Sequence, residues 1–289
     1  MQQFNVLISL PDQKGLVFHI SRTFFELGCN IIRQDEFVDT QSRQFFLRTH
    51  IQAQDSHLQP QTLLARLAQD LGIQAHIRIQ PLSKKSIVIF CTKENHCLGD
   101  LLLRYDSGEL HAHIKAIISN HDTLAPLAKK FDVPFAHIPA PNPQDSNTIE
   151  QGRITHEKEI LAYLKSLGEI DLIVLAKYMR ILSPEFVAHF PHQILNIHHS
   201  FLPAFIGANP YKQAYERGVK IIGASAHFVT KDLDEGPIIT QDVIPIDHTY
   251  SWQDMQRAGR DIEKSVLSRA LKLAIEDRIF VYQNKTIVF

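Results

Sequence analysis

The sequence has few of the features that mark secreted, membrane or disulfide-rich proteins. Its 289 residues include only three cysteines, Cys29, Cys91 and Cys97, which have no C-x-x-C spacing and cannot form a disulfide framework. The N-terminus has no basic segment followed by an apolar stretch, and no apolar run reaches the length of a membrane span. We therefore expect a reduced, cytoplasmic protein with no membrane partner.

The sequence also lacks an excess of charge of either sign. It has 30 lysines and arginines against 31 aspartates and glutamates, so its formal net charge is −1 at pH 7. This balance offers no bulk electrostatic attraction to nucleic acid, and we expect no nucleic-acid partner. The 16 histidines are scattered, and the segment that starts at His156 and Glu157 lacks the second histidine of an H-E-x-x-H motif. We therefore expect no metal.

The first 82 residues predict a small α/β domain of the ferredoxin-like type. Apolar periodicity and turn residues separate its elements. The expected strands cover residues 4–10, 30–38, 44–52 and 73–79, and the expected helices cover residues 15–27 and 61–71. The resulting order, β-α-β-β-α-β, is that of a split-βαβ sandwich.

Residues 86–289 predict a second domain, which follows a short linker at residues 81–85. Its strands are expected at residues 86–91, 112–119, 135–138, 171–175, 194–197, 221–229 and 238–243. Its helices are expected at residues 98–105, 122–131, 149–167 and 251–278, and a loop rich in proline and asparagine at residues 139–147. Strands that alternate with helices of this length favour a Rossmann-like, mostly parallel sheet.

An amide, an imidazole and a carboxylate lie near the expected strand ends, where ligands bind in open α/β sheets. Asn196 and His198 are two residues apart, so an extended segment places them on the same side. Asp234 lies in the turn after the strand that ends at Val229, and Pro203 and Gly207 predict a sharp turn after His198. Each of the three polar residues alone is typical of a turn or a charged surface. Together they are suited to attack on a carbonyl group, because an amide can stabilise an oxyanion, an imidazole can carry a proton and a carboxylate can accept one. Asp234 is the expected base.

Three segments resemble the formyltransferase family that uses formyl-tetrahydrofolate. They are Ala-Lys-Tyr-Met-Arg-Ile-Leu at 176–182, Asn-Ile-His-His-Ser-Phe-Leu-Pro-Ala-Phe-Ile-Gly at 196–207 and His-Phe-Val-Thr-Lys-Asp-Leu-Asp-Glu-Gly-Pro at 227–237. The resemblance implies that Asn196, His198 and Asp234 are catalytic. It also implies a folate substrate, no separate cofactor, and a pterin pocket lined by Met179, Arg180, Ile181, Leu182, Val229 and Thr230.

The loop Pro-Asp-Gln-Lys-Gly-Leu-Val at 11–17 resembles that of an ACT domain, a regulatory module. This implies an amino-acid effector near Asp12 and Gly15, with methionine and glycine as the first to test, and a homo-oligomer. An ACT domain joined to a formyltransferase domain resembles the formyltetrahydrofolate deformylases. These enzymes hydrolyse 10-formyltetrahydrofolate to formate and tetrahydrofolate, a reaction linked to one-carbon metabolism and purine biosynthesis.

Hydrolysis and transfer differ in the acceptor of the formyl group. A phosphorylated amine requires a glycine-rich phosphate cradle after the first strand of the catalytic domain. Residues 92–96 contain no glycine, and Glu94 there repels phosphate. Water is therefore the expected acceptor. The alternatives are a formyltransferase with a non-phosphorylated amine, a non-catalytic folate-binding regulator, and a metal hydrolase. Adjacent histidines on an extended segment point to opposite faces, which disfavours the metal.

Four further questions concern individual residues around the expected site. His199 either packs or positions the water, and packing is the simpler interpretation. We expect His227 to support the Asp234 loop rather than to touch substrate. Lys177 faces either the pocket or solvent. A dry site would raise the pKa of Asp234, which the sequence cannot test.

Overall fold

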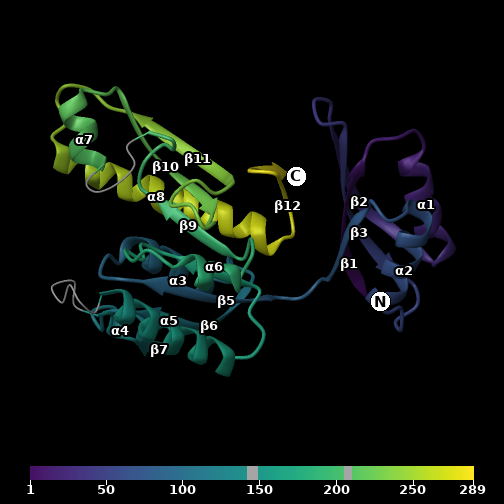
Figure 1. Ribbon diagram of the computed structural model, residues 1–289, viewed down its shortest axis with the longest axis horizontal. Coiled ribbons are helices and arrows are strands. Elements are labelled where there is room, and N and C mark those ends of the chain that lie inside the picture. Colours follow the sequence, from purple (N-terminus) through teal and green to yellow (C-terminus); the bar gives the residue numbers. More distant parts are fainter. Residues whose placement is uncertain (142–148, 205–209) are drawn as a thin grey trace. The chain divides into compact units, whose positions relative to one another are not determined.

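The computed structural model describes residues 1–141, 149–204 and 210–289, which form two compact units (Figure 1). The first unit comprises Met1–Ser83, Glu276–Phe280 and Val288–Phe289, and the second comprises Lys84–Ile275 and Val281–Ile287. Most of the loop expected at residues 139–147, and the turn expected at Gly207, lie outside the described residues. No helix in the described part of the chain is long and apolar enough to cross a membrane.

The first unit is an antiparallel sheet with two helices packed on one face. Its elements are β1 (Gln3–Pro11), α1 (Leu16–Glu26), β2 (Cys29–Asp39), β3 (Gln44–Ala53), α2 (Pro60–Leu71) and β4 (His76–Pro81). The strand order is β2-β3-β1-β4. Helix α1 buries Leu16, Ile20 and Phe24, which recur at helical spacing and join one hydrophobic cluster with strand and α2 residues. The predicted β-α-β-β-α-β order is confirmed.

Among the expected boundaries that were wrong are those of the fourth strand and of the terminal helix of the chain. The fourth strand begins at His76 rather than at residue 73, and Ile73 is fully exposed. Gly72 has a φ of +83°, so α2 ends there and the chain turns before pairing resumes. The long terminal helix ends at Ile275 rather than at residue 278. The next residues belong to the first unit, where the Phe280 ring packs edge-on against Phe46 at 5.4 Å.

The second unit contains a seven-stranded sheet in the order β11-β10-β9-β8-β5-β6-β7. Its strands are β5 (Lys85–Cys91), β6 (Ala112–Ser119), β7 (Phe135–His137), β8 (Leu172–Leu175), β9 (Ile194–His198), β10 (Ile221–Phe228) and β11 (Ile238–Pro245). Its helices are α3 (His96–Asp106), α4 (Ala125–Lys130), α5 (Ile149–Ser166), α6 (Pro184–Ala188), α7 (Pro210–Arg217) and α8 (Trp252–Ile275). The sequence had not indicated the two short helices α6 and α7, nor the C-terminal hairpin of β12 (Ile279–Tyr282) and β13 (Lys285–Val288).

The strand order fixes where a ligand can bind in this unit. Strands β5 to β9 pair in parallel, whereas β10 is antiparallel to both β9 and β11, so the predicted mostly parallel α/β sheet is confirmed. From β5 the chain continues to β6 and β7 on one side, then crosses back to β8 and β9 on the other. The order therefore reverses between β5 and β8. The crevice beyond the carboxyl ends of these two strands is the topological switch point, where open α/β sheets bind ligands.

Candidate active site

The pairing of β9 with β10 brings the predicted catalytic residues together. Asn196 and His198 both lie within β9, which ends at His198, one residue later than we expected. The antiparallel register places His227 opposite Asn196, and Ser225 opposite His198. The side chains of one face therefore come from both strands, with the amide and imidazole of β9 beside the imidazole of His227.

Asp234 reaches this face because the loop between β10 and β11 turns back sharply. Its backbone adopts the left-handed conformation, with a φ of 56°. Gly236 passes so close to β10 that a Cβ atom there would lie 1.8 Å from the carbonyl oxygen of Phe228. As a result, one Asp234 oxygen lies 3.3 Å from Nδ1 of His198, and the other lies 3.7 Å from Nε2 of His227. The structure thus groups the three predicted residues around His227.

His227 orients the amide of Asn196. The Asn196 Nδ2 atom lies 3.2 Å from Nε2 of His227, and an amide nitrogen can only donate. The His227 Nδ1 atom lies 3.1 Å from the carbonyl oxygen of Phe228, which can only accept. Both contacts are satisfied when the His227 proton is on Nδ1. The second N–H of the Asn196 amide is then available to an oxyanion in the site.

His198 has one nitrogen tied to protein and one left for substrate. Its side chain is buried, Nδ1 faces Asp234, and Nε2 has no hydrogen-bond partner in the described part of the protein. Burial acts to raise the pKa of Asp234, but the contact with His198 outweighs it and holds the pKa well below its usual range. The raised pKa considered for a dry site is therefore wrong in direction, and Asp234 is ionised at neutral pH.

The segment that follows β8 carries four of the predicted pocket residues, Met179, Arg180, Ile181 and Leu182. The N–H of Met179 donates to the Thr92 hydroxyl at 3.0 Å, which anchors the start of the segment. At its far end, the buried Glu157 carboxylate accepts from the backbone N–H and the hydroxyl of Ser183. The segment is therefore held at both ends by groups distant in the sequence.

These four residues line a cavity of about 280 Å³ together with Arg153, His156, Glu157 and Tyr178. Met179 and Ile181 are 57% and 62% exposed, so their apolar side chains are accessible to a flat ligand. Leu182 and Val229 instead pack against the hydrophobic cluster of the sheet. Thr230 lies at the start of the Asp234 loop, where its hydroxyl donates to the Asp232 carbonyl at 3.2 Å.

Ser225, which the sequence analysis overlooked, fixes the turn after His198. Its buried hydroxyl donates to the Ser200 carbonyl at 2.9 Å and accepts from the Leu202 N–H at 3.0 Å. Gln241 on β11 donates to the Leu202 carbonyl at 3.0 Å. Ser225 lies opposite His198 in the pairing of β9 with β10. In the sequence, its only distinguishing feature is that it is a polar residue inside an apolar strand.

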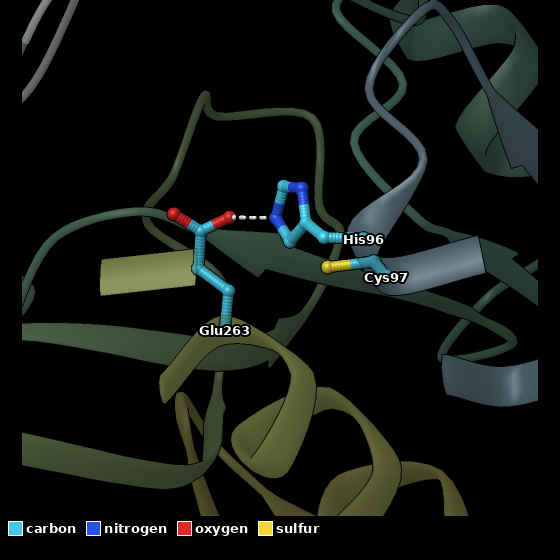
Figure 2. A group of neighbouring side chains, drawn as sticks. All are labelled: His96, Cys97 and Glu263. Carbon is cyan, nitrogen blue, oxygen red and sulfur yellow. Dashed lines mark hydrogen bonds and ion pairs between the residues drawn. The ribbon is translucent and has the colours of Figure 1, made fainter. Parts of the chain in front are cut away.

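A second polar group lies beyond the carboxyl ends of β5 and β8, and it was not predicted. Figure 2 shows His96 and Cys97, from the start of α3, turned toward Glu263 on α8. The His96 Nε2 atom lies 2.7 Å from one oxygen of the buried Glu263 carboxylate, and the Lys177 ammonium lies 3.2 Å from the same oxygen. The Tyr211 hydroxyl donates to the other oxygen at 2.7 Å. Lys177, left open between pocket and solvent, is therefore a buried ion-pair partner.

The spacing of His96, Cys97 and Glu263 is also short enough for metal ligands, since their donor atoms lie within 4.8 Å of one another. The chemistry of the three residues does not fit a metal. Burial raises the pKa of the Cys97 thiol well above its usual value. Both Glu263 oxygens already accept from protein groups, and the Lys177 ammonium would repel a cation. We interpret these residues as a closed ion-pair network.

The predicted effector residues Asp12 and Gly15 lie in the first unit, in the exposed loop between β1 and α1. The backbone N–H of Asp12 donates to the Arg43 carbonyl at 2.8 Å. Gly15 has a φ of +91° and precedes the first residue of α1. The glycine is therefore needed for the turn that starts the helix, whether or not the loop binds a ligand.

Comparison with known proteins identifies the family of this chain. Residues 85–271 match the formyl transferase family model. The chain is 49% identical over 283 residues to the formyltetrahydrofolate deformylase of Haemophilus influenzae, covering 98% of both proteins. A crystal structure of a formyltetrahydrofolate deformylase from Pseudomonas syringae has a TM-score of 0.91 and 38% identity, covering 100% of this chain and 95% of the other.

The chain belongs to the formyltetrahydrofolate deformylase family. The resemblance, the enzyme class and the two-part fold inferred from the sequence are thereby confirmed. The glycinamide ribonucleotide transformylase 1 of Symbiobacterium toebii is more distant, with a TM-score of 0.64 and 28% identity. That alignment covers 71% of this chain and 94% of the transformylase. A deformylase and a transformylase therefore share a catalytic fold.

Replacement of Gly236 tests the geometry of the Asp234 loop. We expect Gly236→Ala to lower the free energy of unfolding by about 2 kcal/mol or more, because the new Cβ collides with the Phe228 carbonyl and the backbone must move. Asp234 moves with the loop, so deformylase activity should fall as well. The matched control is Gly99→Ala on α3, where no atom lies within 4 Å of the new Cβ. Chemical denaturation measures the free energy of unfolding of both variants. Equal values would contradict the close approach of Gly236 to the Phe228 carbonyl.

Proposed function

We propose that this chain hydrolyses 10-formyltetrahydrofolate to formate and tetrahydrofolate, with Asn196, His198 and Asp234 as its catalytic residues. The observation that carries the proposal is their grouping, in which Asp234 lies 3.3 Å from Nδ1 of a buried His198 whose Nε2 has no partner among the described residues. Asn196 lies two residues away on the same strand, with one amide N–H still available.

We propose that the folate binds to two segments of the chain, residues 179–182 and residues 229–230. In the proposal the pterin lies against the exposed apolar side chains of Met179 and Ile181, and Arg180 and Leu182 complete that wall. Val229 and Thr230 precede Asp234 on the opposite loop and offer backbone groups to the edge of the pterin. A ligand held between the two segments has its formyl group directed toward His198 and Asp234.

The reaction adds water to the formyl carbon and then breaks the bond between that carbon and N10. The carbonyl oxygen becomes an oxyanion, which the free Asn196 N–H and His198 stabilise by hydrogen bonds. When the tetrahedral intermediate collapses, the electrons of the C–N bond pass to N10, which takes up a proton as tetrahydrofolate leaves. The carbon retains the oxygen of water and departs as formate.

The proton is carried by His198 rather than by Asp234. We had expected Asp234 to be the base, but a carboxylate whose pKa lies well below its usual range is a weak proton acceptor. Its ionised form holds the Nδ1 proton of His198 in place and stabilises positive charge on the ring. The buried Nε2 atom can then accept a proton from water and deliver it to N10.

Purified protein should release formate from 10-formyltetrahydrofolate when water is the only acceptor. The physical reason is that the site contains a proton carrier and oxyanion donors without requiring an amine. Formate production is measured with and without added amines. Dependence of turnover on an amine would instead support a formyltransferase, and folate binding without any turnover would support a non-catalytic regulator.

Substitutions in the catalytic group should reduce turnover without preventing binding. We expect His198→Ala and Asp234→Asn each to lower kcat by about 10²–10⁴-fold, because proton transfer or its orientation is lost. The folate should still bind, since its pocket is unchanged. Asp232→Asn is the matched control, because Asp232 is exposed on the same loop and only its backbone carbonyl makes a contact there. Turnover at the control's rate in both catalytic variants would remove these residues from the mechanism.

We also propose that the first unit binds a small amino acid near Asp12 and Gly15 and that the protein is a cytoplasmic homo-oligomer. The β-α-β-β-α-β fold and the exposed loop before α1 support a regulatory role. Methionine and glycine should therefore change the rate of formate release, and Asp12→Ala should abolish that response while leaving the basal rate intact. The assay is repeated with each amino acid, and sedimentation measures the oligomer. An unchanged response in the variant would place the effector elsewhere.

A further inference from the structure

The switch-point crevice of the catalytic sheet is filled by the chain's own charged side chains. His96 follows β5 and Lys177 follows β8, the two strands between which the strand order reverses. An open α/β sheet offers this position to a ligand. Here both residues converge on Glu263, which extends from α8 and is 1% exposed.

The network leaves no polar group of Glu263 for an incoming molecule. One carboxylate oxygen accepts from His96 and Lys177, and the other accepts from the Tyr211 hydroxyl. Burial acts to raise the pKa of Glu263, but His96, Lys177 and Tyr211 outweigh it and lower the pKa to about 2. A carboxylate that stays charged at this depth requires all of its partners, so the network is costly to open.

A glycine on α8 leaves the space that Tyr211 needs to reach the network. A Cβ atom at Gly259 would lie 2.0 Å from the Tyr211 hydroxyl oxygen, so only glycine lets the phenol reach Glu263 one turn further along the helix. Glycine inside a helix is less favourable than alanine by about 1 kcal/mol. Gly259 therefore lowers the stability of α8 at the position where Tyr211 packs against the helix.

The same residues make the start of α3 unsuited to phosphate. The N-terminus of a helix attracts anions, and a phosphorylated acceptor would use it. His96 instead lies between two carboxylates, with Nε2 2.7 Å from Glu263 and Nδ1 3.4 Å from Glu94. Glu94 is further held by Arg260 of α8 at 3.8 Å. A phosphate approaching this helix would have to compete with Glu94 and Glu263 for Arg260 and Lys177, the cations that these carboxylates already hold.

The network continues to the catalytic group through His199. The His199 ring lies 6.1 Å from the Tyr211 ring and 5.3 Å from the His198 ring. Burial and the Lys177 charge lower the pKa of His199 to about 4, so it is neutral at neutral pH and adds no anion-binding charge. An acceptor approaching His198 from the switch point would have to displace this chain of packed side chains.

We propose that the network of His96, Lys177, Tyr211 and Glu263 occupies the place of the acceptor and thereby excludes phosphorylated primary amines from the formyl group. This inference rests on the proposed hydrolysis. In a transfer, the amine nitrogen would bond to the formyl carbon, N10 would leave with a proton, and the product would be a formamide. With the amine excluded, water takes the same position relative to the carbon, and formate is released.

The test opens the crevice and offers it a small phosphorylated amine, 2-aminoethyl phosphate. The double variant Glu94→Gly, His96→Gly removes one carboxylate and the imidazole and gives the loop the glycines of a phosphate cradle. We expect 2-aminoethyl phosphate to inhibit its formate release at a concentration about tenfold or more below that needed for the wild type. Lys93→Gly is the matched control, because Lys93 is exposed on the same loop and outside the network; it should behave as the wild type.

Two results would overturn the inference. One is saturable inhibition or thermal stabilisation of the wild type by 2-aminoethyl phosphate at the concentrations that affect the double variant. Inorganic phosphate is the control ligand for this measurement on the wild type, which does not depend on any variant. The other is a folded double variant, or a folded His96→Ala variant, with no gain in sensitivity. Both differ from failure of the proposed function, which appears as no formate release by the wild type without any amine.

Discussion

The antiparallel pairing of β9 with β10 is the constraint on which the site depends. The register places His227 opposite Asn196, so the amide is oriented by a neighbour whose own ring is fixed by the Phe228 carbonyl. A shift of one residue would turn every side chain of β9 to the other face and separate Asn196 and His198 from Asp234. The close return at Gly236 matters for the same reason, because it brings Asp234 back to the strand pair.

The buried Glu263 and the half-buried Asp234 illustrate how a carboxylate keeps its charge away from solvent. Asp234 and Glu263 each have both oxygens facing donors or imidazole nitrogens, and each has a pKa below its usual value despite burial. Removing one partner of such a carboxylate leaves its charge uncompensated. The resulting loss of stability is larger than the net stabilisation that the intact pair provides. The two groups therefore hold their surroundings rigid, and substrate does not have to organise them.

Much of the fold followed from local signals in the sequence. Apolar periodicity located most strands and long helices, and Gly72 marked the end of α2, although alternation at residues 73–79 began the fourth strand too early. Residues 276–278 were assigned to the terminal helix, because the contact of the nearby Phe280 with Phe46 depends on packing that no local pattern records. The same holds for His96 and Glu263, which lie 167 residues apart and meet only once the sheet and α8 have formed.

The catalytic trio was easier to predict because its members follow strand ends within a recognisable motif, whereas its protonation depended on contacts outside the motif. Desolvation alone favours a raised pKa for Asp234, and the opposing imidazole of His198 becomes visible only in the folded chain. Since the pKa values of both carboxylates of this region and of His199 lie below their usual ranges, these three groups are weak acceptors of a proton from water. His198 has a buried nitrogen without a partner among the described residues, so proton transfer in this site is assigned to the imidazole and orientation to the carboxylate.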